Sequence, residues 1–554
     1  MRRGFRGVAI LVVLVALASF AVMAGTASAG TARQADKTSF VEADIGGITT
    51  LDWAQAYQGD PVRHVAFELG GSLVEWDTSK LRAAGCNQFG TVADIKPGVA
   101  ESWKWDASTS SWIFKLRASA KSPAGNVIQS EDVRWNFERL IYYKQAVANF
   151  LMNNVALYGT VAGDVSTNPI KVIDKSTFAL KVKQKTALDI AILTLLWFIP
   201  VDSVEAKKHA TADDPYAAAW LKNNRPAYGP FQVSGFAPGS AVFMTANKNY
   251  WGPRGNIKKL IIKSIPDAST RRSLLEAGKV DMAQRLTFSD YIALTQKGKS
   301  SGVKVSRCFS GDRTTILLSF RNKTLANLKV RQAIQLATNR AELAKGGYLG
   351  QYPPAIHGAS AVVPYTRSAA TKFPAVDIVK AKALLAEAGV PNGFDLPLII
   401  HPSRPGPEVD QISVLWKAQM AKIGINVQIQ LAPSAADFSN QFFAGNYQAM
   451  LYLEPPAVGD PFYSLNLYNT TASFQNTFGY NNAEYDRLVG EIRVTPPGKA
   501  REAKIAKVAQ IIVETVPVIY VTDNIFLHAV RDRFTGWTYP PNGELYVYTL
   551  TATK

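Results

Sequence analysis

Aromatic side chains gather in stretches of the sequence that are typical of loops. They form three groups along the chain: Trp53 with Tyr57, Trp197 with Phe198, and Tyr452 with Phe462 and Tyr463. An aromatic ring at a cleft buries a large apolar area at a small cost in rotamer entropy, which suits the reversible binding of a small solute. These residues therefore favour non-covalent binding, and packing in the core or at a hinge is the alternative for each ring.

Motifs for covalent chemistry are absent from the sequence. It contains no G-x-S-x-G nucleophile elbow, no G-x-x-x-x-G-K-[ST] phosphate loop and no G-x-G-x-x-G fingerprint. Five widely spaced histidines and two cysteines exclude a local HExxH metal pattern and a multi-cysteine zinc site. We therefore predict no enzyme activity, no cofactor and no metal. A secreted hydrolase whose acids lie far apart in sequence is an alternative.

The chain of 554 residues is basic, with a formal net charge of +18, and 47% of its residues are hydrophobic. The composition predicts a folded protein of several domains. Lysines and arginines are scattered, which favours a solvated surface over a nucleic-acid groove. A sensor that binds polyanions through this surface is a further alternative.

The first 29 residues have the pattern of a secretory signal. Three arginines within residues 2–6 precede an apolar run at 8–23, and Ala27-Ser28-Ala29 is a small-residue cleavage site. We predict an exported protein, cleaved near Ala29 and Gly30 by the Sec or the twin-arginine route and not anchored through a lipidated cysteine. A retained membrane anchor is the alternative. Export allows a Cys86–Cys308 disulfide, and two free thiols are equally compatible with the sequence.

Helix-like and strand-like stretches alternate along the chain, which predicts an α/β fold. Helices are expected after the caps Ser130, Asp267 and Asp377 and over 411–423 and 501–515. Strands are expected over 112–116, 178–182, 258–265, 396–400 and 425–431. The order of strand 396–400, helix 411–423 and strand 425–431 predicts a β-α-β crossover. Ligands often bind at loops that a rigid scaffold positions. The sequence has proline-rich loops at 352–364, 402–407 and 455–461.

Six ordered segments resemble one known family. They are Thr50-Leu51-Asp52, residues 95–103 (IKPGVAESW), 130–139 (SEDVRWNFER), 228–231 with 247–252 (YGPF and NKNYWG), 265–281 (IPDASTR to EAGKVD) and 330–334 (VRQAI). The set is similar to the extracytoplasmic solute-binding proteins of ABC importers, of the oligopeptide, dipeptide and nickel type. Trp53 stands where that family's opening motif has proline. We expect the motif residues, Asp267 and Arg331 among them, to be scaffold rather than ligand contacts.

The resemblance implies an α/β periplasmic-binding-protein fold with three domains, in which two lobes close on a ligand about a hinge. Domain I would combine 36–66, 191–306 and 511–554, domain II would be 67–190, and domain III would be 307–510 as the second lobe. It also implies a periplasmic or extracellular monomer that hands a small solute to a membrane permease, with no nucleic acid and no covalent chemistry.

One departure from the family pattern bears on the chemical class of the ligand. Peptide-binding members carry an aspartate, three residues before an acid-proline pair, that binds the ammonium group of the peptide. Here the pair is Asp460-Pro461, and the matching position is Ala457. We therefore predict an oligosaccharide or another neutral organic solute, and a standard di- or oligopeptide is the alternative, with Glu454 as a substitute for the aspartate.

Eight residues are candidates for ligand contact. They are Trp53, Tyr57, Trp197, Phe198, Arg404, Tyr452, Glu454 and Asp460. Rings at Trp53, Trp197 and Tyr452 would stack on a sugar, because the apolar face of a sugar packs on an aromatic face. On this hypothesis, replacing Trp197 with alanine weakens binding and leaves the fold intact. Arg404 would hold a carboxylate, with a solvated loop arginine as the alternative.

Overall fold

The computed structural model describes residues 37–55, 62–77, 79–80, 91–360, 371–455, 458–538 and 545–553. The predicted signal, Tyr57, Cys86 and Ala457 lie outside these residues. Cys308 is disulfide-bonded, and Cys86 is the only other cysteine of the sequence. Within the described ranges, no helix combines the length and the apolarity needed to cross a membrane.

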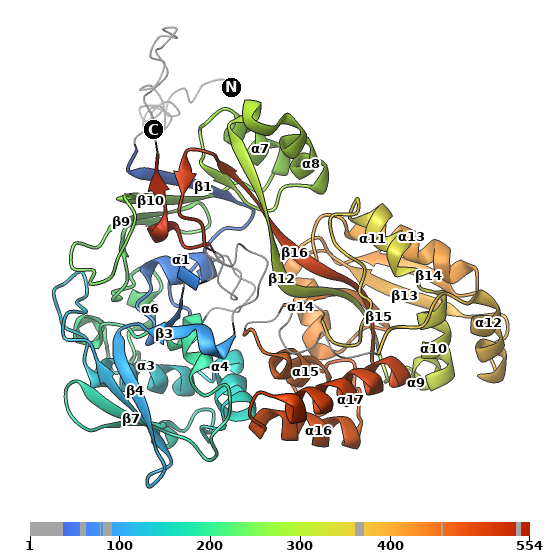
Figure 1. The fold of residues 1–554 in the computed structure, drawn as a ribbon, viewed down its shortest axis with the longest axis horizontal. Coiled ribbons are helices and arrows are strands. Elements are labelled where there is room, and N and C mark those ends of the chain that lie inside the picture. The colour runs from blue at the N-terminus through green and yellow to red at the C-terminus, as the bar shows by residue number, and fades with distance from the viewer. Residues whose placement is uncertain are drawn as a thin grey trace, which may run out of the picture. The chain divides into compact units, whose positions relative to one another are not determined.

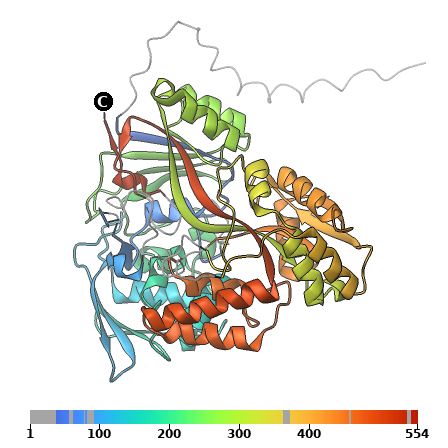
Figure 2. The ribbon, with the colours of Figure 1, turned by 45° about the vertical axis from the view of Figure 1, so that its right-hand side comes forward.

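A mixed sheet of ten strands is the centre of the fold, in the order β14-β13-β15-β12-β16-β11-β1-β10-β9-β8. Two long strands, β12 (Val303–Leu318) and β16 (Val518–Arg531), pair antiparallel and run side by side through its middle (Figures 1 and 2). On one side lie β11 (Met282–Ala283), β1 (Ser39–Asp44), β10 (Lys259–Ser264), β9 (Ala241–Ala246) and β8 (Phe231–Ala237). On the other lie β15 (Ala449–Glu454), β13 (Asp395–Ile400) and β14 (Asn426–Leu431).

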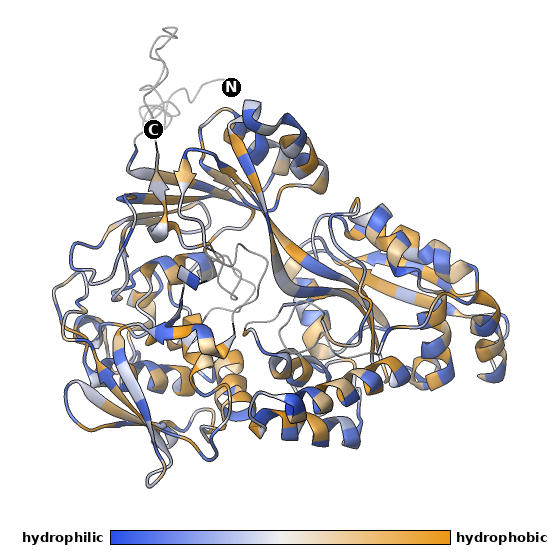
Figure 3. Cartoon of the chain, viewed as in Figure 1, coloured by the Kyte–Doolittle hydropathy of each residue, from blue (hydrophilic) through white to orange (hydrophobic). Residues whose placement is uncertain are grey.

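The predicted crossover is confirmed, because β13 and β14 are parallel neighbours and α13 (Val409–Ala421) lies between them in the chain. The helices α10 (Leu328–Ala337), α11 (Arg340–Gly347) and α12 (Ile378–Glu387) belong to the same region. Hydrophobic and hydrophilic residues mix along each of these ribbons, as amphipathic helices on a sheet require (Figure 3). Two further helices, α16 (Ala483–Val494) and α17 (Lys499–Thr515), pack against each other.

Most predicted helix starts are confirmed. Asp267 caps α7 (Ala268–Glu276) by accepting from the Thr270 N–H at 2.7 Å, and Asp377 caps α12. The prediction for α3 (Ser130–Tyr142) was one residue off, since Gln129 is its cap and Ser130 is already helical. Asp132 accepts from the Gln129 N–H at 2.7 Å and so closes a capping box one residue earlier.

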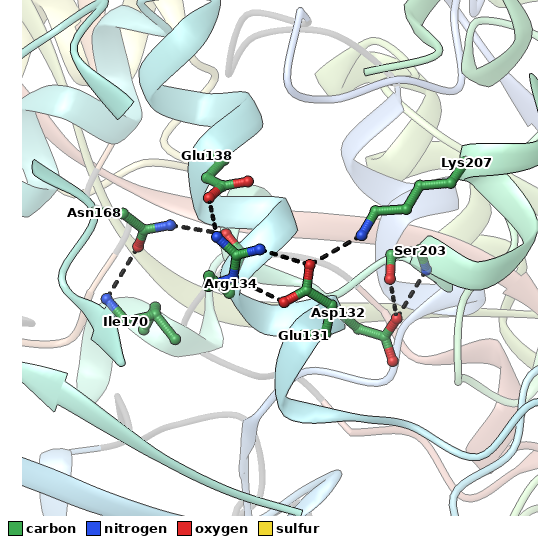
Figure 4. Close-up of polar contacts among 8 residues, drawn as sticks. All are labelled: Glu131, Asp132, Arg134, Glu138, Asn168, Ile170, Ser203 and Lys207. Carbon is green, nitrogen blue, oxygen red and sulfur yellow. Dashed lines mark hydrogen bonds and ion pairs between the residues drawn. The ribbon is translucent and has the colours of Figure 1, made fainter. Parts of the chain in front are cut away.

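A smaller antiparallel sheet carries the order β4-β5-β7-β6, from β4 (Ala100–Asp106), β5 (Ser111–Leu116), β7 (Thr177–Lys181) and β6 (Ile170–Val172). Helix α3 contacts β6. At the start of α3, Asp132 turns toward Ser203, while Arg134 pairs with Glu131 and Glu138 (Figure 4). Asp132 also accepts from the Tyr228 hydroxyl at 2.8 Å. The residues shared with the family at 130–139 and 228–231 therefore join two segments of the scaffold.

Two motif arginines bind backbone carbonyls instead of acids. Arg271 donates to the carbonyls of Ile265, Pro266, Gln284 and Arg285. Arg331 does the same for Leu325, Ala326, Thr515 and Val516. Buried carbonyls need donors, and one guanidinium has five. Both arginines are thus scaffold residues, as the sequence predicts for Arg331.

Candidate functional site

A cavity lies where β12 and β16 pass β15 and the start of α15 (Pro461–Asn469). Its empty space is about 400 Å³, including a part open to solvent. The lining residues come from five places: Gly311 and Arg313 on β12, Tyr520 on β16, Glu454 on β15, the stretch Gly358–Ser360, and Pro461, Ser464 and Leu465 on α15. The cavity therefore sits beside the two strands that join the halves of the main sheet.

A buried group of charges forms one wall of this cavity. Arg313 is in register with Glu454 on one neighbouring strand and with Asp523 on the other. Its Nε lies 2.8 Å from Asp523 Oδ1, and its Nη atoms donate to the carbonyls of His357 and Gly358. The guanidinium also lies over the Tyr520 ring, 3.7 Å from the centroid. One cation is thus held between two carboxyl groups.

Glu454 is the group in this wall that is left with a free oxygen. The residue is 3% exposed, and among the described residues nothing donates a hydrogen bond to its Oε1. Burial raises the pKa of Glu454 to about 8, against the opposing effects of the Arg313 charge and a hydrogen bond from Tyr520. The carboxyl is therefore mainly protonated at neutral pH, and a cation placed beside it would favour its ionised form.

Arg404 and Tyr452 come together next to this wall. Arg404 Nη1 donates to the Tyr452 hydroxyl, and its guanidinium lies 4.9 Å from the centroid of that ring. The Tyr452 ring stacks on Phe442 at 4.3 Å. Tyr452 and Glu454 are two residues apart on β15, so their side chains share one face of the sheet. Three of the predicted residues, Arg404, Tyr452 and Glu454, are thus brought into one region.

Asp460 was predicted as a ligand contact, but the structure gives its oxygens other partners. It forms a bidentate ion pair with Arg501, at 2.8 and 2.9 Å, and both side chains are 1% exposed. It also caps α15 by accepting from the Phe462 N–H, with Pro461 in the first turn. Because both oxygens are engaged, the side chain is positioned to hold α15 beside the cavity.

Trp53, Trp197 and Phe198 do not reach this cavity either. All three are fully buried in the main hydrophobic core. Trp53 lies under the Arg225 guanidinium, 3.5 Å from its ring centroid, and Phe198 packs on Phe137 at 5.3 Å. The Trp197 carbonyl accepts from Asn136 on α3 at 2.9 Å. The burial of these rings favours the packing role over the platform for a sugar, and Tyr57 lies outside the described residues.

Replacing Trp197 with alanine is therefore expected to destabilise the fold rather than to weaken binding directly. Removing a fully buried tryptophan costs about 3–5 kcal/mol of unfolding free energy. Urea unfolding measures the loss, and titration of the remaining folded protein should give the parent affinity. Weaker binding at parent stability would restore Trp197 as a ligand contact.

Sequence reasoning missed Arg313 and Tyr520, which line the cavity, and Asp523, which pairs with Arg313. Asp523 follows the apolar run 516–521, and Arg313 precedes another at 316–318. A charged residue inside a strand that is buried on both faces needs a partner or a ligand. That signal was available, but it does not tell which distant charge is the partner.

Segments at 146–155 and 461–494 also touch each other, although they are far apart in sequence. The Asn154 carbonyl in η2 (Leu151–Val155) accepts from Arg493 Nη1 at 3.0 Å and from Asn466 at 3.4 Å. The rings of Phe150 and Phe474 meet edge to face at 5.3 Å. By the predicted domain bounds, these contacts lie between domain II and domain III, which belong to different lobes.

The variants Arg493→Ala and Phe474→Ala are each expected to weaken solute binding about tenfold. Because the predicted domain bounds place these contacts between the lobes, their loss should lower the population of the closed form, and the apparent affinity should fall in proportion. Isothermal titration calorimetry measures the affinity, and small-angle scattering of the free protein should show a larger radius of gyration. The control is Tyr142→Ala, which removes an exposed ring whose aromatic neighbours among the described residues are Tyr143 and Tyr216. Equal affinities in all variants would contradict the prediction.

Comparisons with known proteins agree with this architecture. Residues 94–476 match the bacterial extracellular solute-binding proteins, family 5, middle part. The chain is 26% identical to heme-binding protein A of Haemophilus influenzae, over 81% of this chain and 83% of the relative. It is 25% identical to di/tripeptide-binding protein 1 of Pseudomonas aeruginosa, over 83% and 86%.

Solved structures show the same fold. The Helicobacter pylori periplasmic binding protein DppA, in complex with the peptide STSA, superposes with a TM-score of 0.76 at 20% identity, covering 93% of this chain and 98% of that one. The murein tripeptide-binding protein MppA of Escherichia coli gives 0.78 at 19%, covering 94% and 99%. The predicted two-lobed α/β fold is thus confirmed. The chain belongs to the bacterial extracellular solute-binding proteins of family 5, and it is the exported substrate-binding component of an ABC importer.

Proposed function

We propose that the solute is a small peptide or a related solute with a free amino group, and that its ammonium meets Glu454 in the cavity. The observation that carries this proposal is the buried Glu454 carboxyl, whose Oε1 has no donor among the described residues. An ammonium group offers three donors and a positive charge, and a charge-assisted hydrogen bond in a buried site is the strong kind.

The surroundings of Glu454 support this choice over a neutral sugar. Arg313 binds Asp523 and two carbonyls, and among the described residues it gives no hydrogen bond to Glu454 Oε1. The rings on which a sugar would stack, Trp53 and Trp197, are fully buried in the core. Several relatives are named for di- and tripeptides, which is the same chemistry. The proposal therefore takes up the peptide alternative, with Glu454 in place of the aspartate that is missing at Ala457.

Arg404 is the second residue of the proposed binding site. Its guanidinium is held at Tyr452 on the same strand as Glu454. A peptide of a few residues carries an ammonium and a carboxylate at its two ends, and arginine binds carboxylates through paired donors. We assign Glu454 to the amino end of the solute and Arg404 to its carboxylate end.

The proposal also includes the predictions on the signal, the oligomeric state, the permease and the domain bounds. The signal at 1–29 is cleaved near Ala29, the mature chain acts as a monomer without cofactor or catalytic step, and a membrane permease receives the solute. Domain I consists of 36–66, 191–306 and 511–554, with domain II at 67–190 and domain III at 307–510. On this division, β12 enters the second lobe near its first residues, and β16 belongs to domain I.

The test is a thermal-shift and calorimetry panel of three solute classes. They are free di- to tetrapeptides, the same peptides with an acetylated amino end, and di- to tetrasaccharides. A ligand that binds the native state raises the unfolding midpoint by mass action. We expect the free peptides to bind and the acetylated ones to fail. Equal binding of acetylated peptides, or binding of saccharides alone, would overturn the assignment.

A further inference from the structure

A second buried group of charges lies away from the cavity, around Asp52. Arg139 on α3 and Arg225, four residues after α6 (Ala218–Leu221), both approach this one carboxylate. Arg139 Nη2 lies 2.5 Å from Asp52 Oδ2, and Arg225 Nη1 lies 3.6 Å from Asp52 Oδ1. All three residues are almost fully buried, with exposed fractions of 0%, 4% and 1% for Arg139, Arg225 and Asp52.

In the described part of the chain, no acceptor is found for three nitrogens of the two guanidinium groups. Arg139 donates through Nε to the Tyr216 carbonyl, and Arg225 donates through Nη2 to the Ile199 carbonyl. Among the described residues, nothing accepts from Arg139 Nη1 or from Nε and Nη1 of Arg225. A buried donor without an acceptor is costly, and more so when it is charged. The protein therefore presents several unused donors around one spot.

The charges of the described residues at this spot do not balance. Two guanidinium groups face one carboxylate, which leaves an excess of one positive charge among them. The nearby carboxylate of Asp214 is taken by the N–H groups of Ala218 and Ala219 and by the Tyr143 hydroxyl. Trp53, Trp135 and Tyr143 supply aromatic rings around the cations but no anion. Desolvation lowers the pKa of Arg225, and the Arg139 charge acts in the same direction while Asp52 opposes it.

From these contacts we infer that Arg139 and Arg225 form a buried binding site for a small monovalent anion of the chloride type. A single negative charge would balance the pair, and a monatomic ion accepts from several N–H donors at once. The near-complete burial of both arginines excludes an extended solute. The inference is independent of the cavity at Glu454 and of the solute proposed for it.

The test compares halide with a bulky anion on the unmodified protein. The unfolding midpoint is followed while sodium gluconate is exchanged for sodium chloride at constant ionic strength, so that general screening is unchanged. We expect a saturable rise of about 3 °C or more, as binding to the native state requires. Crystals soaked in sodium bromide should show an anomalous peak between the two guanidinium groups. An unchanged midpoint together with no bromide peak would overturn the site.

The variant Arg225→Met removes one half of the site and should abolish the chloride response. Its matched control is Arg117→Met, because Arg117 also lies over a tryptophan, 4.3 Å from the Trp251 centroid, but donates to the Gly98 carbonyl. The control should keep the full chloride response. A parent-like response in Arg225→Met would refute the assignment. If Arg225→Met fails to fold, the bromide experiment on the unmodified protein decides.

Discussion

Replacing Arg313 with methionine is expected to lower the free energy of unfolding by about 3–5 kcal/mol at pH 8. The guanidinium stands between Asp523 and Glu454 in the strand register, and it is 4% exposed. Its removal takes the nearest described cation away from two buried carboxyl groups, and it also takes a donor away from the carbonyls of His357 and Gly358. Breaking a buried pair is costly because the remaining charge stays uncompensated.

The loss should depend on pH in a defined direction. The Arg313 charge holds the pKa of Glu454 down against the effect of burial. Without it, the folded variant keeps the Glu454 proton to a higher pH than the folded parent does, while the unfolded state loses that proton near the ordinary value, so the stability of the variant falls more steeply as pH rises. The gap between the parent and Arg313→Met should therefore be smaller at pH 5 than at pH 8. Urea unfolding at the two pH values measures it.

A matched control separates this effect from a general loss of charge. Arg487→Met removes an arginine that pairs with Glu484 and Glu491 on the exposed face of α16. Exposed pairs contribute little to stability, so its midpoint should stay close to that of the parent. Equal losses in the two variants, or a loss in Arg313→Met that grows toward pH 5, would contradict the buried-pair account.

The elements that were predicted correctly are those with a local cause. Asp377 caps α12 and the crossover 395–431 forms as expected, because a cap and a hydrophobic period act over a few residues. Glu454 was proposed from its place near the Asp460-Pro461 pair, and Arg404 from its place in the loop after strand 396–400. The wall of the cavity was not found, because Arg313 and Asp523 are 210 positions apart and meet only through strand register.

The aromatic residues show a second limit of sequence reasoning. Trp197 and Tyr452 have the same preference for a half-buried site, and nothing in their neighbours distinguishes a ligand platform from core packing. Trp197 became core because α3 covers it, and Tyr452 came to the cavity region because it precedes Glu454 on β15. Which faces become covered is decided by contacts between segments hundreds of residues apart.

The free protein should show the titration of Glu454 directly in its stability. The pKa of this carboxyl is raised to about 8 when folded, against an ordinary value of 4.5. The folded state therefore holds a proton that the unfolded state has lost between pH 4.5 and about 8, and stability falls as pH rises through that window. In Glu454→Gln this contribution is absent, so the variant should become more stable relative to the parent as pH increases.

The affinity for the solute should instead rise with pH up to about pH 8. An ammonium beside Glu454 requires the ionised carboxylate, so binding below pH 8 releases a proton, and affinity should rise toward tenfold per pH unit. Above about pH 8 the amino group of the solute itself loses its charge, and affinity should fall again. Calorimetry in buffers of different ionisation enthalpy measures the released proton. A peptide whose affinity does not change between pH 5 and 7.5 would contradict the ammonium assignment.

The variant Glu454→Gln should lose both the slope and most of the affinity. Removing a buried charged partner costs about 2–4 kcal/mol, or roughly 30- to 1000-fold in Kd at pH 8. Glu408→Gln is the matched control, since burial also raises the pKa of Glu408, to about 7, and this residue is not among those that line the cavity. The control should alter the pH dependence of stability but keep the affinity and its slope. Because desolvation raises the pKa of both glutamates and only Glu454 lines the cavity, a ligand contact at Glu454 would make the two variants differ in binding.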